Sequence, residues 1–291
     1  MSAVPASMTP SALPLLSSRR NPLVRQLRQL HDARGRREQG LLLLEGTHLL
    51  QEAARLGLQP RLLLATPAWI DAHAALLQRL AVRPQPVTPE VLEFVATTNH
   101  PDGVLAALEP PCAAAAAPQR ALAAGGAPGL WLALDTIQDP GNLGTLMRTA
   151  LAAEVAGLWL ADGADPHQPK VLRSSAGAAL ALPLWRGERA QLCDQLRAAL
   201  QPPPAAGRSP VQLVATVPPE QGGVPYWQLD WTQPTVLMLG SEGAGLAPEL
   251  LDLATHWVTI PHGGAVESLN VAVAAAPLLL ERQRQRATAR D

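Results

Sequence analysis

Cysteine and long apolar runs are scarce in this chain, and each shortage excludes a class of protein. The two cysteines, Cys112 and Cys193, lie far apart and outside any CxxC pattern, which argues against a disulfide framework and against a zinc site. No apolar run approaches the roughly 20 residues that a membrane span needs. The first 18 residues lack the charged start and the continuous apolar core of a signal peptide. We therefore expect a cytoplasmic protein that has no membrane partner and no bound metal.

Net charge is also nearly absent, because 23 lysines and arginines oppose 24 aspartates and glutamates. A chain with this balance has no global field that attracts nucleic acid. Positive charge is instead local: seven arginines fall between Arg19 and Arg37, where Asp32 is the only acid. Such a run forms either a solvated helix face or a surface that contacts phosphates. The run by itself does not decide between the two.

The 291 residues divide into two regions of alternating strands and helices, each long enough to bury a core. Residues 1–18 lack periodicity and are expected to form a disordered tail. Strands and helices alternate in residues 19–109, with a first helix opening at Asn21-Pro22 and a single helix from Pro67 to Leu80, which predicts a small α/β domain. Residues 110–128 are rich in Ala, Pro and Gly and form the expected linker. The alternation restarts in residues 129–291, so the predicted fold class is α/β in both regions. Its first four strands are expected at 130–134, 157–160, 182–185 and 211–216.

The second region ends in two glycine-rich turns, each of which follows an apolar strand. Residues 240–245 follow a predicted strand at 236–239, and residues 261–264 follow one at 257–260. A helix is expected to open at Ser268. Backbone N–H groups that such turns leave free can bind the polar edges of a small ligand. Each turn taken alone could equally be an ordinary connection that needs a positive φ.

Polar residues gather in three clusters that follow strand ends of this region. The first is D-T-I-Q-D-P-G-N-L-G-T-L-M-R, in which Asn142 is expected to cap a helix and Arg148 lies nearly two turns later. The second, L-G-S-E-G-A-G, is not G-x-G-x-x-G and lacks the P-loop lysine, so a nicotinamide interpretation is weak. The third runs from I-P-H to E-S-L-N-V-A-V-A. A helix cap, a surface ion pair or a loop position would explain each of these side chains singly.

Together the three clusters resemble the SpoU (TrmH-like) family of RNA ribose 2′-O-methyltransferases. The matching residues are N-L-G-T-L-M-R, L-G-S-E-G-A-G-L and I-P followed by E-S-L-N-V-A-V-A, in the family's order and spacing. The resemblance covers nearly all of residues 129–281. It extends to the first region, where L-L-L-L-E-G-T-H-L-L-Q-E-A and N-H-P-D-G-V-L-A are similar to the family's substrate-binding domain, which has an L30e-like fold.

This resemblance implies a C-terminal α/β trefoil knot, S-adenosylmethionine as the methyl donor held by the loops of the knot, and a homodimer formed through the knotted domains. By motif position, the backbone and apolar part of the cofactor pocket would be formed by Leu239, Gly240, Gly243, Ile260 and Leu269. The polar, catalytic site around the ribose would be formed by Asn142, Arg148, Glu242, Ser268 and Asn270.

The chemistry of methyl transfer constrains the role of Arg148. The leaving thioether is neutral, so the barrier lies in making a ribose hydroxyl nucleophilic and aligning it with the methyl group. Accounts of the family give the deprotonation to this arginine, but a guanidinium with a pKa above about 12 is a poor base at neutral pH. We expect instead that Arg148 binds the adjacent phosphate and lowers the pKa of the hydroxyl. Glu242 would orient either Arg148 or Asn142.

The resemblance implies structured RNA as substrate, and we favour 23S rRNA because the L30e-like domain is typical of rRNA-directed members. A tRNA substrate is one alternative, and a non-catalytic RNA-binding or ribosome-assembly factor is another. Residues 129–291 contain 11 basic and 15 acidic residues, a net charge of −4, so the catalytic domain needs a second region to bind RNA. This favours the phosphate-contacting interpretation of the arginine run and selects Arg34, Arg36 and Arg37. In the last helix, Pro277 is expected to force a kink. The final arginines are expected to be solvated: Arg282, Arg284, Arg286 and Arg290.

Overall fold

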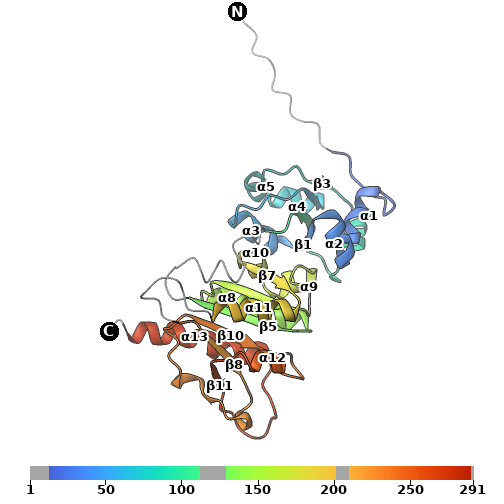
Figure 1. Ribbon diagram of the computed structural model, residues 1–291. Helices are drawn as coiled ribbons and strands as arrows, with labels where there is room; N and C mark the ends of the chain where they lie inside the picture. The colour runs from blue at the N-terminus through green and yellow to red at the C-terminus, as the bar shows by residue number, and fades with distance from the viewer. Residues whose placement is uncertain (1–12, 112–128, 201–209, 290–291) are drawn as a thin grey trace, which may run out of the picture. The chain divides into compact units, whose positions relative to one another are not determined.

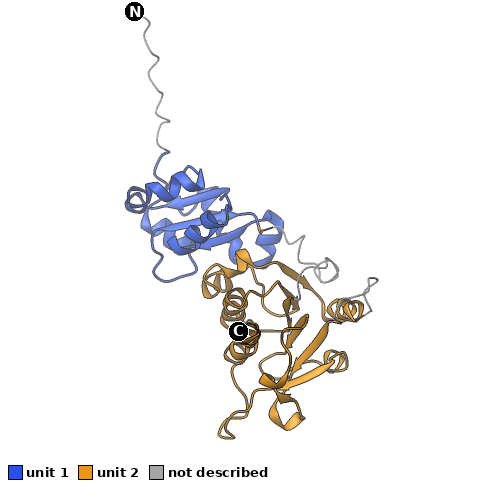
Figure 2. Cartoon of the chain, turned by 90° about the vertical axis from the view of Figure 1, so that its left-hand side faces the viewer, with its two compact units in different colours: residues 1–109 blue, residues 110–291 orange. Residues whose placement is uncertain are grey.

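The computed structural model describes residues 13–111, 129–200 and 210–289, which fall into two compact units (Figures 1 and 2). Unit 1 spans residues 1–109 and unit 2 spans residues 110–291. Several sequence-based expectations lie outside the described residues: the first part of the tail, most of the linker, Cys112 and Arg290. None of the helices in the described ranges combines the length and the apolar character that a membrane-spanning helix requires.

Unit 1 contains a four-stranded sheet with the strand order β1-β4-β2-β3. Strand β4 is antiparallel to both of its neighbours, and β3 is parallel to β2. The strands are β1 (Leu42–Glu45), β2 (Leu62–Ala65), β3 (Gln85–Pro86) and β4 (Val104–Leu108). The helices are α1 (Pro22–Arg28), the 3-10 helix η1 (Gln29–His31), α2 (Ala33–Gln39), α3 (Thr47–Arg55), α4 (Pro67–Ala72), α5 (Ala74–Leu80) and α6 (Pro89–Val95).

Helix α1 begins where the sequence predicts, because Asn21 caps it and Pro22 occupies its first turn. The side chain of Asn21 accepts a hydrogen bond of 2.9 Å from the N–H of Leu23. The apolar face of α1 and η1 then packs with α6 against one face of the sheet. That core contains Val24, Leu27, Leu30, Leu43, Leu64, Val91, Leu92, Val95 and Leu105. The polar face of α1, which carries the arginines, is left at the surface.

Two predictions for unit 1 are wrong. The disordered tail does not extend to residue 18, because Leu16 pairs in parallel with Val87: its N–H donates to Pro86 at 2.9 Å and its carbonyl accepts from Thr88 at 3.0 Å. An extended segment can pair there because β3 lies at the edge of the sheet. The single helix expected from Pro67 to Leu80 is broken at His73, whose φ of −123° is not helical.

Arg36 is a further correction, because its guanidinium is used inside unit 1. The residue is only 7% exposed. Its Nη1 donates to the carbonyl oxygens of Leu30 at 2.9 Å and His31 at 2.7 Å, at the end of η1. Helix α2 directs this one arginine inward, so Arg36 is not available as a phosphate contact. Its neighbours Arg34 and Arg37 remain exposed.

Unit 2 contains a seven-stranded sheet with the order β7-β6-β5-β10-β8-β11-β9, in which every neighbouring pair is parallel. The strands are β5 (Leu130–Asp135), β6 (Gly157–Ala161), β7 (Leu184–Gly187), β8 (Gln212–Thr216), β9 (Val224–Pro225), β10 (Thr235–Leu239) and β11 (His256–Thr259). The helices are α8 (Pro140–Ala152), α9 (Pro169–Ser174), α10 (Ala178–Ala181), α11 (Arg189–Ala199), α12 (Pro248–Leu251), α13 (Val271–Thr288) and two 3-10 turns, η3 (Pro219–Gln221) and η4 (Tyr226–Gln228).

Both faces of this sheet are covered, as a parallel sheet requires. On one face Trp131 and Trp159 pack against Leu192 of α11 and Leu250 of α12. The alternate strand residues, such as Leu132, are also fully buried. Helix α8 contacts α9, α10 and α13, so these four helices form a second contacting group. The strands therefore read as continuous apolar runs, which is why the sequence predicted most of them.

The order of the strands brings the first two polar clusters together. The chain leaves β5 toward β6 and β7 on one side, and later places β10 directly beside β5 on the other. The carboxyl ends of β5 and β10 therefore meet at the point where the strand order reverses. Open parallel sheets bind their ligands at such a point. The first cluster follows β5 and the second follows β10.

Helix boundaries near these strand ends differ from those predicted. Asp139, not Asn142, caps α8, because its carboxylate accepts the N–H of Asn142 at 2.8 Å. Asn270, not Ser268, caps α13, and its side-chain oxygen accepts from Ala272 at 2.9 Å and from Val273 at 3.3 Å. In both cases the chain offers two capping residues, and only the path of the preceding loop selects between them.

Helix α13 continues through Pro277. Its second half is held by packing and by polar contacts with the segment before β10, which offset the N–H that proline lacks. Arg282 is 5% exposed and donates to the carbonyls of Trp231 and, at 2.8 Å, of Gln233. The expectation that Arg282 is solvated is therefore wrong. The indole of Trp231 is fully buried beneath this contact.

Candidate functional site

Three side chains from the three polar clusters form one hydrogen-bonded chain, which we call the amide relay. Asn142 of α8 donates from Nδ2 to Glu242 at 3.0 Å. Asn270 donates from Nδ2 to Oδ1 of Asn142 at 2.9 Å. The side-chain Oδ1 of Asn270 accepts from the N–H groups of Ala272 and Val273 in the first turn of α13. The relay therefore joins Glu242, Asn142 and Asn270, and it ends on the backbone of a helix.

Glu242 sets the direction of the relay, because an ionised carboxylate only accepts hydrogen bonds. Besides Asn142, its oxygens accept long hydrogen bonds from the N–H groups of Gln138 and Asp139, at 3.4 Å each. Partial burial by itself raises the pKa of Glu242, but the hydrogen bonds from Asn142 and from the backbone outweigh it, so the pKa is lowered. The carboxylate is therefore ionised at neutral pH, and the contacts it accepts are lost only when acid protonates it.

The glycine-rich loop, residues 240–247, folds back on itself between β10 and α12. Ser241 and Gly245 exchange two backbone hydrogen bonds of 3.0 and 3.1 Å, and Gly245 has a φ of +68°. A Cβ on Gly240 would lie 1.9 Å from the carbonyl carbon of Gly245, so only glycine fits there. Gly243 differs, because a Cβ there would meet no atom within 4 Å. The packing of this chain does not require glycine at position 243.

The remaining residues assigned by the resemblance lie outside the relay. Leu239 is buried at the end of β10, while Ile260 after β11 and Leu269 before α13 are half-buried. Arg148 and Ser268 are exposed, and no hydrogen bond or ion pair within the described residues connects either of them to the relay. The structure thus brings together three of the five predicted catalytic residues, and it leaves Arg148 and Ser268 directed at solvent.

Sequence reasoning missed a second set of contacts, centred on Asp135 and called here the Asp135 network. Asp135 ends β5 and is 2% exposed. Its carboxylate accepts from Nε of Arg189 at 2.8 Å, from the N–H of Ala247 at 3.0 Å and from the hydroxyl of Thr136 at 2.9 Å. Arg189 also donates to the hydroxyl of Thr136 at 3.0 Å. An acid that ends a buried apolar strand is a visible signal, but its partner Arg189 lies 54 residues away.

Two properties of the Asp135 network show that it is tightly constrained. Thr136 has a φ of +58°, which is uncommon for a β-branched residue and persists only where the surroundings fix it. The hydrogen bond to Asp135 raises the pKa of Arg189, so the guanidinium stays charged. Because Ala247 closes the glycine-rich loop, the network anchors the end of that loop to β5.

Among the described residues, no group of three or more His, Cys, Asp or Glu side chains is placed to hold a metal ion.

Comparison with known proteins agrees with this geometry. Residues 129–280 match the SpoU rRNA Methylase family, and residues 21–106 match the MRM3-like substrate binding domain. The chain belongs to the SpoU rRNA methylase family. The resemblance stated from the three motifs and the predicted α/β fold class are both confirmed. The first two family motifs lie at the point where the strand order reverses, and Asn270 of the third motif reaches Asn142 there.

Individual relatives of this SpoU family member cover almost its full length. An uncharacterized tRNA/rRNA methyltransferase of Synechocystis sp. is 44% identical over 274 residues, which is 93% of each chain. The 23S rRNA (guanosine(2553)-2′-O)-methyltransferase RlmP of Bacillus subtilis is 30% identical, over 91% of this chain and 97% of its own. Among solved structures, the SpoU methyltransferase AviRb of Streptomyces viridochromogenes in complex with AdoMet superimposes with a TM-score of 0.78 at 31% identity, covering 92% of this chain and 99% of its own.

The Asp135 network yields a prediction for stability. Asp135→Ala leaves Arg189 and the N–H of Ala247 without their acceptor, and breaking a buried pair in this way is costly. Because Arg189 is 39% exposed and water can solvate it, we expect the free energy of unfolding to fall by only about 2 kcal/mol. Urea denaturation measures this change.

The matched control for this prediction is Asp194→Ala, which removes an exposed carboxylate that pairs with Arg197 three residues away on α11. It should change the free energy of unfolding by less than about 0.5 kcal/mol. Equal effects of the two substitutions would contradict the structural role given to Asp135.

Proposed function

We propose that this chain transfers a methyl group from S-adenosylmethionine to a ribose 2′-hydroxyl of structured RNA, with 23S rRNA as the favoured target. The observation that carries the proposal is the amide relay, which links motif residues 100 and 128 positions apart in sequence at the carboxyl ends of the strands. The membership in the SpoU family and the rRNA target in the name of RlmP support it. A substrate-binding domain in unit 1 supports an RNA substrate.

The residues after β10 and β11 fit the proposed cofactor. The glycine-rich loop presents backbone groups, and Gly243 leaves open space where a side chain would otherwise stand. Ile260 and Leu269 are half-buried and supply apolar surface of the kind that an adenine ring needs, while Leu239, buried at the end of β10, leads directly into the glycine-rich loop. When bound, the sulfonium supplies an electrophilic methyl group. The chain's own part is to hold donor and ribose in line, which is a task of positioning.

Within this proposal the polar residues divide into two groups. Glu242, Asn142 and Asn270 already satisfy one another, so they position the loops around the ribose, and Glu242 orients Asn142 rather than Arg148. Arg148 and Ser268 are exposed and available to substrate. We propose that Arg148 binds the phosphate next to the target ribose and lowers the pKa of its 2′-hydroxyl. Ser268 contacts the ribose or the cofactor at the mouth of the site.

The proposal includes a homodimer formed through unit 2. Val273 and Leu280 lie seven residues apart, and therefore on one face of α13, and they are 63% and 42% exposed. Leu151 of the neighbouring helix α8 is 39% exposed. Exposed apolar side chains on contacting helices are typical of an interaction surface. The trefoil knot and the cytoplasmic location remain predictions.

Calorimetric titration with S-adenosylmethionine tests the enzyme class directly. We expect saturable binding with one site per chain, followed by 2′-O-methylation of unmodified 23S rRNA transcribed in vitro. Mass spectrometry of the nucleosides identifies the product, and mapping 2′-O-methyl sites in total RNA with and without the gene locates it. Methylation of tRNA alone would favour the tRNA alternative. Absence of cofactor binding would favour the non-catalytic assembly factor.

Arg148 is tested by two substitutions that separate its charge from its shape. Arg148→Ala should lower kcat about 100-fold, the scale of losing one charge-stabilising donor, while the affinity for S-adenosylmethionine stays constant. Arg148→Lys should lose less, because lysine keeps the charge but not the planar fork. The exposed Arg197→Ala on α11 is the control. Turnover near that of the unchanged protein in both Arg148 variants would remove this residue from the chemistry.

Because Arg36 is buried, only Arg34 and Arg37 of that segment remain proposed RNA contacts. Arg34 pairs with Glu38 at 2.7 Å, so part of its charge is already compensated. We expect Arg34→Ala with Arg37→Ala to raise the KM for RNA about threefold without changing cofactor affinity. Arg36→Ala should instead lower the melting temperature. RNA binding that is unchanged across a salt titration would refute the proposed role of Arg34 and Arg37.

A further inference from the structure

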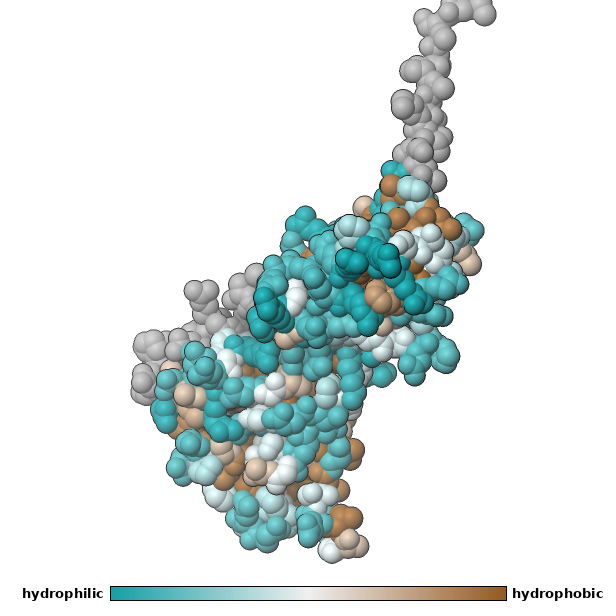
Figure 3. Space-filling view, turned by 90° about the vertical axis from the view of Figure 1, so that its right-hand side faces the viewer, coloured by the Kyte–Doolittle hydropathy of each residue, from teal (hydrophilic) through white to brown (hydrophobic). Residues whose placement is uncertain are grey.

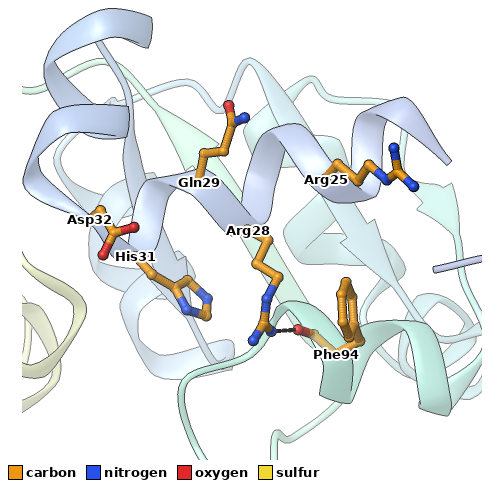
Figure 4. Close-up of a pocket in the computed structure, with 6 residues that line it drawn as sticks. All are labelled: Arg25, Arg28, Gln29, His31, Asp32 and Phe94. Carbon is orange, nitrogen blue, oxygen red and sulfur yellow. Dashed lines mark hydrogen bonds between the residues drawn. The ribbon is translucent and has the colours of Figure 1, made fainter. Parts of the chain in front are cut away.

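Unit 1 contains a hollow of about 410 Å³ between the end of α1, η1 and α6. Figure 4 shows the side chains that line it, with Arg28 of α1 facing Phe94 of α6. The lining residues are Arg25, Arg28, Gln29, His31, Asp32 and Phe94. We call this feature the arginine hollow. Its arginines, Arg25 and Arg28, belong to the middle of the run and are not those of the Arg34–Arg37 segment that the sequence favoured.

Arg28 is held in position by Phe94. Its guanidinium carbon lies 4.4 Å from the centre of the Phe94 ring, and its Nη1 donates to the carbonyl oxygen of Phe94. The guanidinium of Arg19 lies 5.6 Å from the centre of the same ring. The one phenylalanine of the chain thus contacts two arginines. A guanidinium oriented in this way loses less conformational entropy when it binds an anion than a free one does.

Two arginines line the hollow against one acid. Arg25 and Arg28 are exposed and line it together with Asp32, while Arg19, which lies over the same Phe94 ring, interacts electrostatically with Glu90. Arg25 has no ion pair within the described residues, whereas Arg34 is paired with Glu38. Figure 3 shows strongly hydrophilic side chains gathered on unit 1 beside hydrophobic ones. An open hollow with two arginines is suited to a polyanion rather than to an apolar ligand.

We infer that the arginine hollow binds the sugar–phosphate backbone of the substrate RNA, with Arg25 and Arg28 as the phosphate contacts and Phe94 as the residue that positions Arg28. This inference rests on the proposed function and names the surface of unit 1 that holds its substrate. The contacts are to phosphates, so they position the RNA without reading its sequence. Such contacts release counterions and make binding depend on salt.

The test uses the full chain and unmodified 23S rRNA transcribed in vitro, with binding measured by filter retention over a series of salt concentrations. Arg25→Gln with Arg28→Gln should weaken RNA binding at least about tenfold and reduce the slope of log K against log salt by about two. The matched control is Arg79→Gln with Arg83→Gln, which removes the same charge from exposed positions elsewhere in unit 1. The control should leave both the affinity and the slope nearly unchanged.

Two single variants keep the inference testable if the double variant folds poorly. Arg25 makes no side-chain hydrogen bond within the described residues, so Arg25→Glu should keep the melting temperature while weakening RNA binding about tenfold. Phe94→Leu keeps an apolar side chain but removes the ring that holds Arg28. It should weaken RNA binding while the salt slope stays, because the charge remains, and Phe94→Tyr should restore the affinity.

The outcomes separate this inference from the proposed function. Equal losses in the hollow and control variants would overturn the inference and show that only the net charge of unit 1 matters. Unchanged binding in Arg25→Glu, with methylation of the RNA intact, would overturn the hollow while the proposed function stands. Absence of methylation by the unchanged protein would count against the function itself. Saturable binding of inorganic phosphate that Arg25→Glu abolishes, without loss of RNA binding, would assign the hollow to a free anion instead.

Discussion

The hydrogen bond between Glu242 and Asn142 is the contact on which the site depends. It joins the glycine-rich loop to the start of α8, across 100 residues of sequence, and it fixes which way the amide of Asn142 faces. That orientation leaves Oδ1 of Asn142 to accept from Asn270, whose own oxygen then caps α13. A single such hydrogen bond contributes only about 1 kcal/mol net. Its effect on the geometry of the site is larger than this energy suggests, because changing either partner leaves the next side chain in the relay without a defined orientation.

The segment from Asp135 to Asn142 holds the glycine-rich loop at two points. Asn142 contacts it at Glu242, and Asp135 contacts it at the N–H of Ala247. Between these anchors lies Gly243, which is exposed and free of neighbouring atoms. The loop is therefore fixed at both ends and open in the middle. A ligand that binds there meets backbone groups already in place, so little conformational entropy is lost in ordering them.

The two units use their charged side chains in different ways. In unit 2 the carboxylates of Glu242 and Asp135 accept hydrogen bonds from neighbouring segments and hold those segments in place. Unit 1 leaves its arginines outside, on the polar face of α1, while Arg36 alone is turned into the core. A long polyanion needs charge spread over an exposed surface, whereas methyl transfer needs a few groups held in fixed positions. Separate units meet these needs without placing repelling charges in one site.

Sequence alone determined the two α/β regions, most strand positions and the three motifs, because these follow from local patterns. Apolar runs of five or six residues mark strands that are buried on both faces, and glycines mark turns that exclude a Cβ. The same patterns placed Asn142, Glu242 and Asn270 in one site through resemblance. Local patterns could not show that these three side chains form hydrogen bonds with one another. Those hydrogen bonds depend on the strand order, which places β10 beside β5.

Other features were decided only by tertiary packing. Arg34, Arg36 and Arg37 are equivalent in sequence, yet the short helix α2 buries Arg36 against the carbonyls of η1. Asp139 and Asn142 can each cap a helix, as can Ser268 and Asn270, and the loop path selects one of each pair. Asp135 meets Arg189 from 54 residues away. Local sequence sets which groups can bond, and the packing of distant segments sets which of them do.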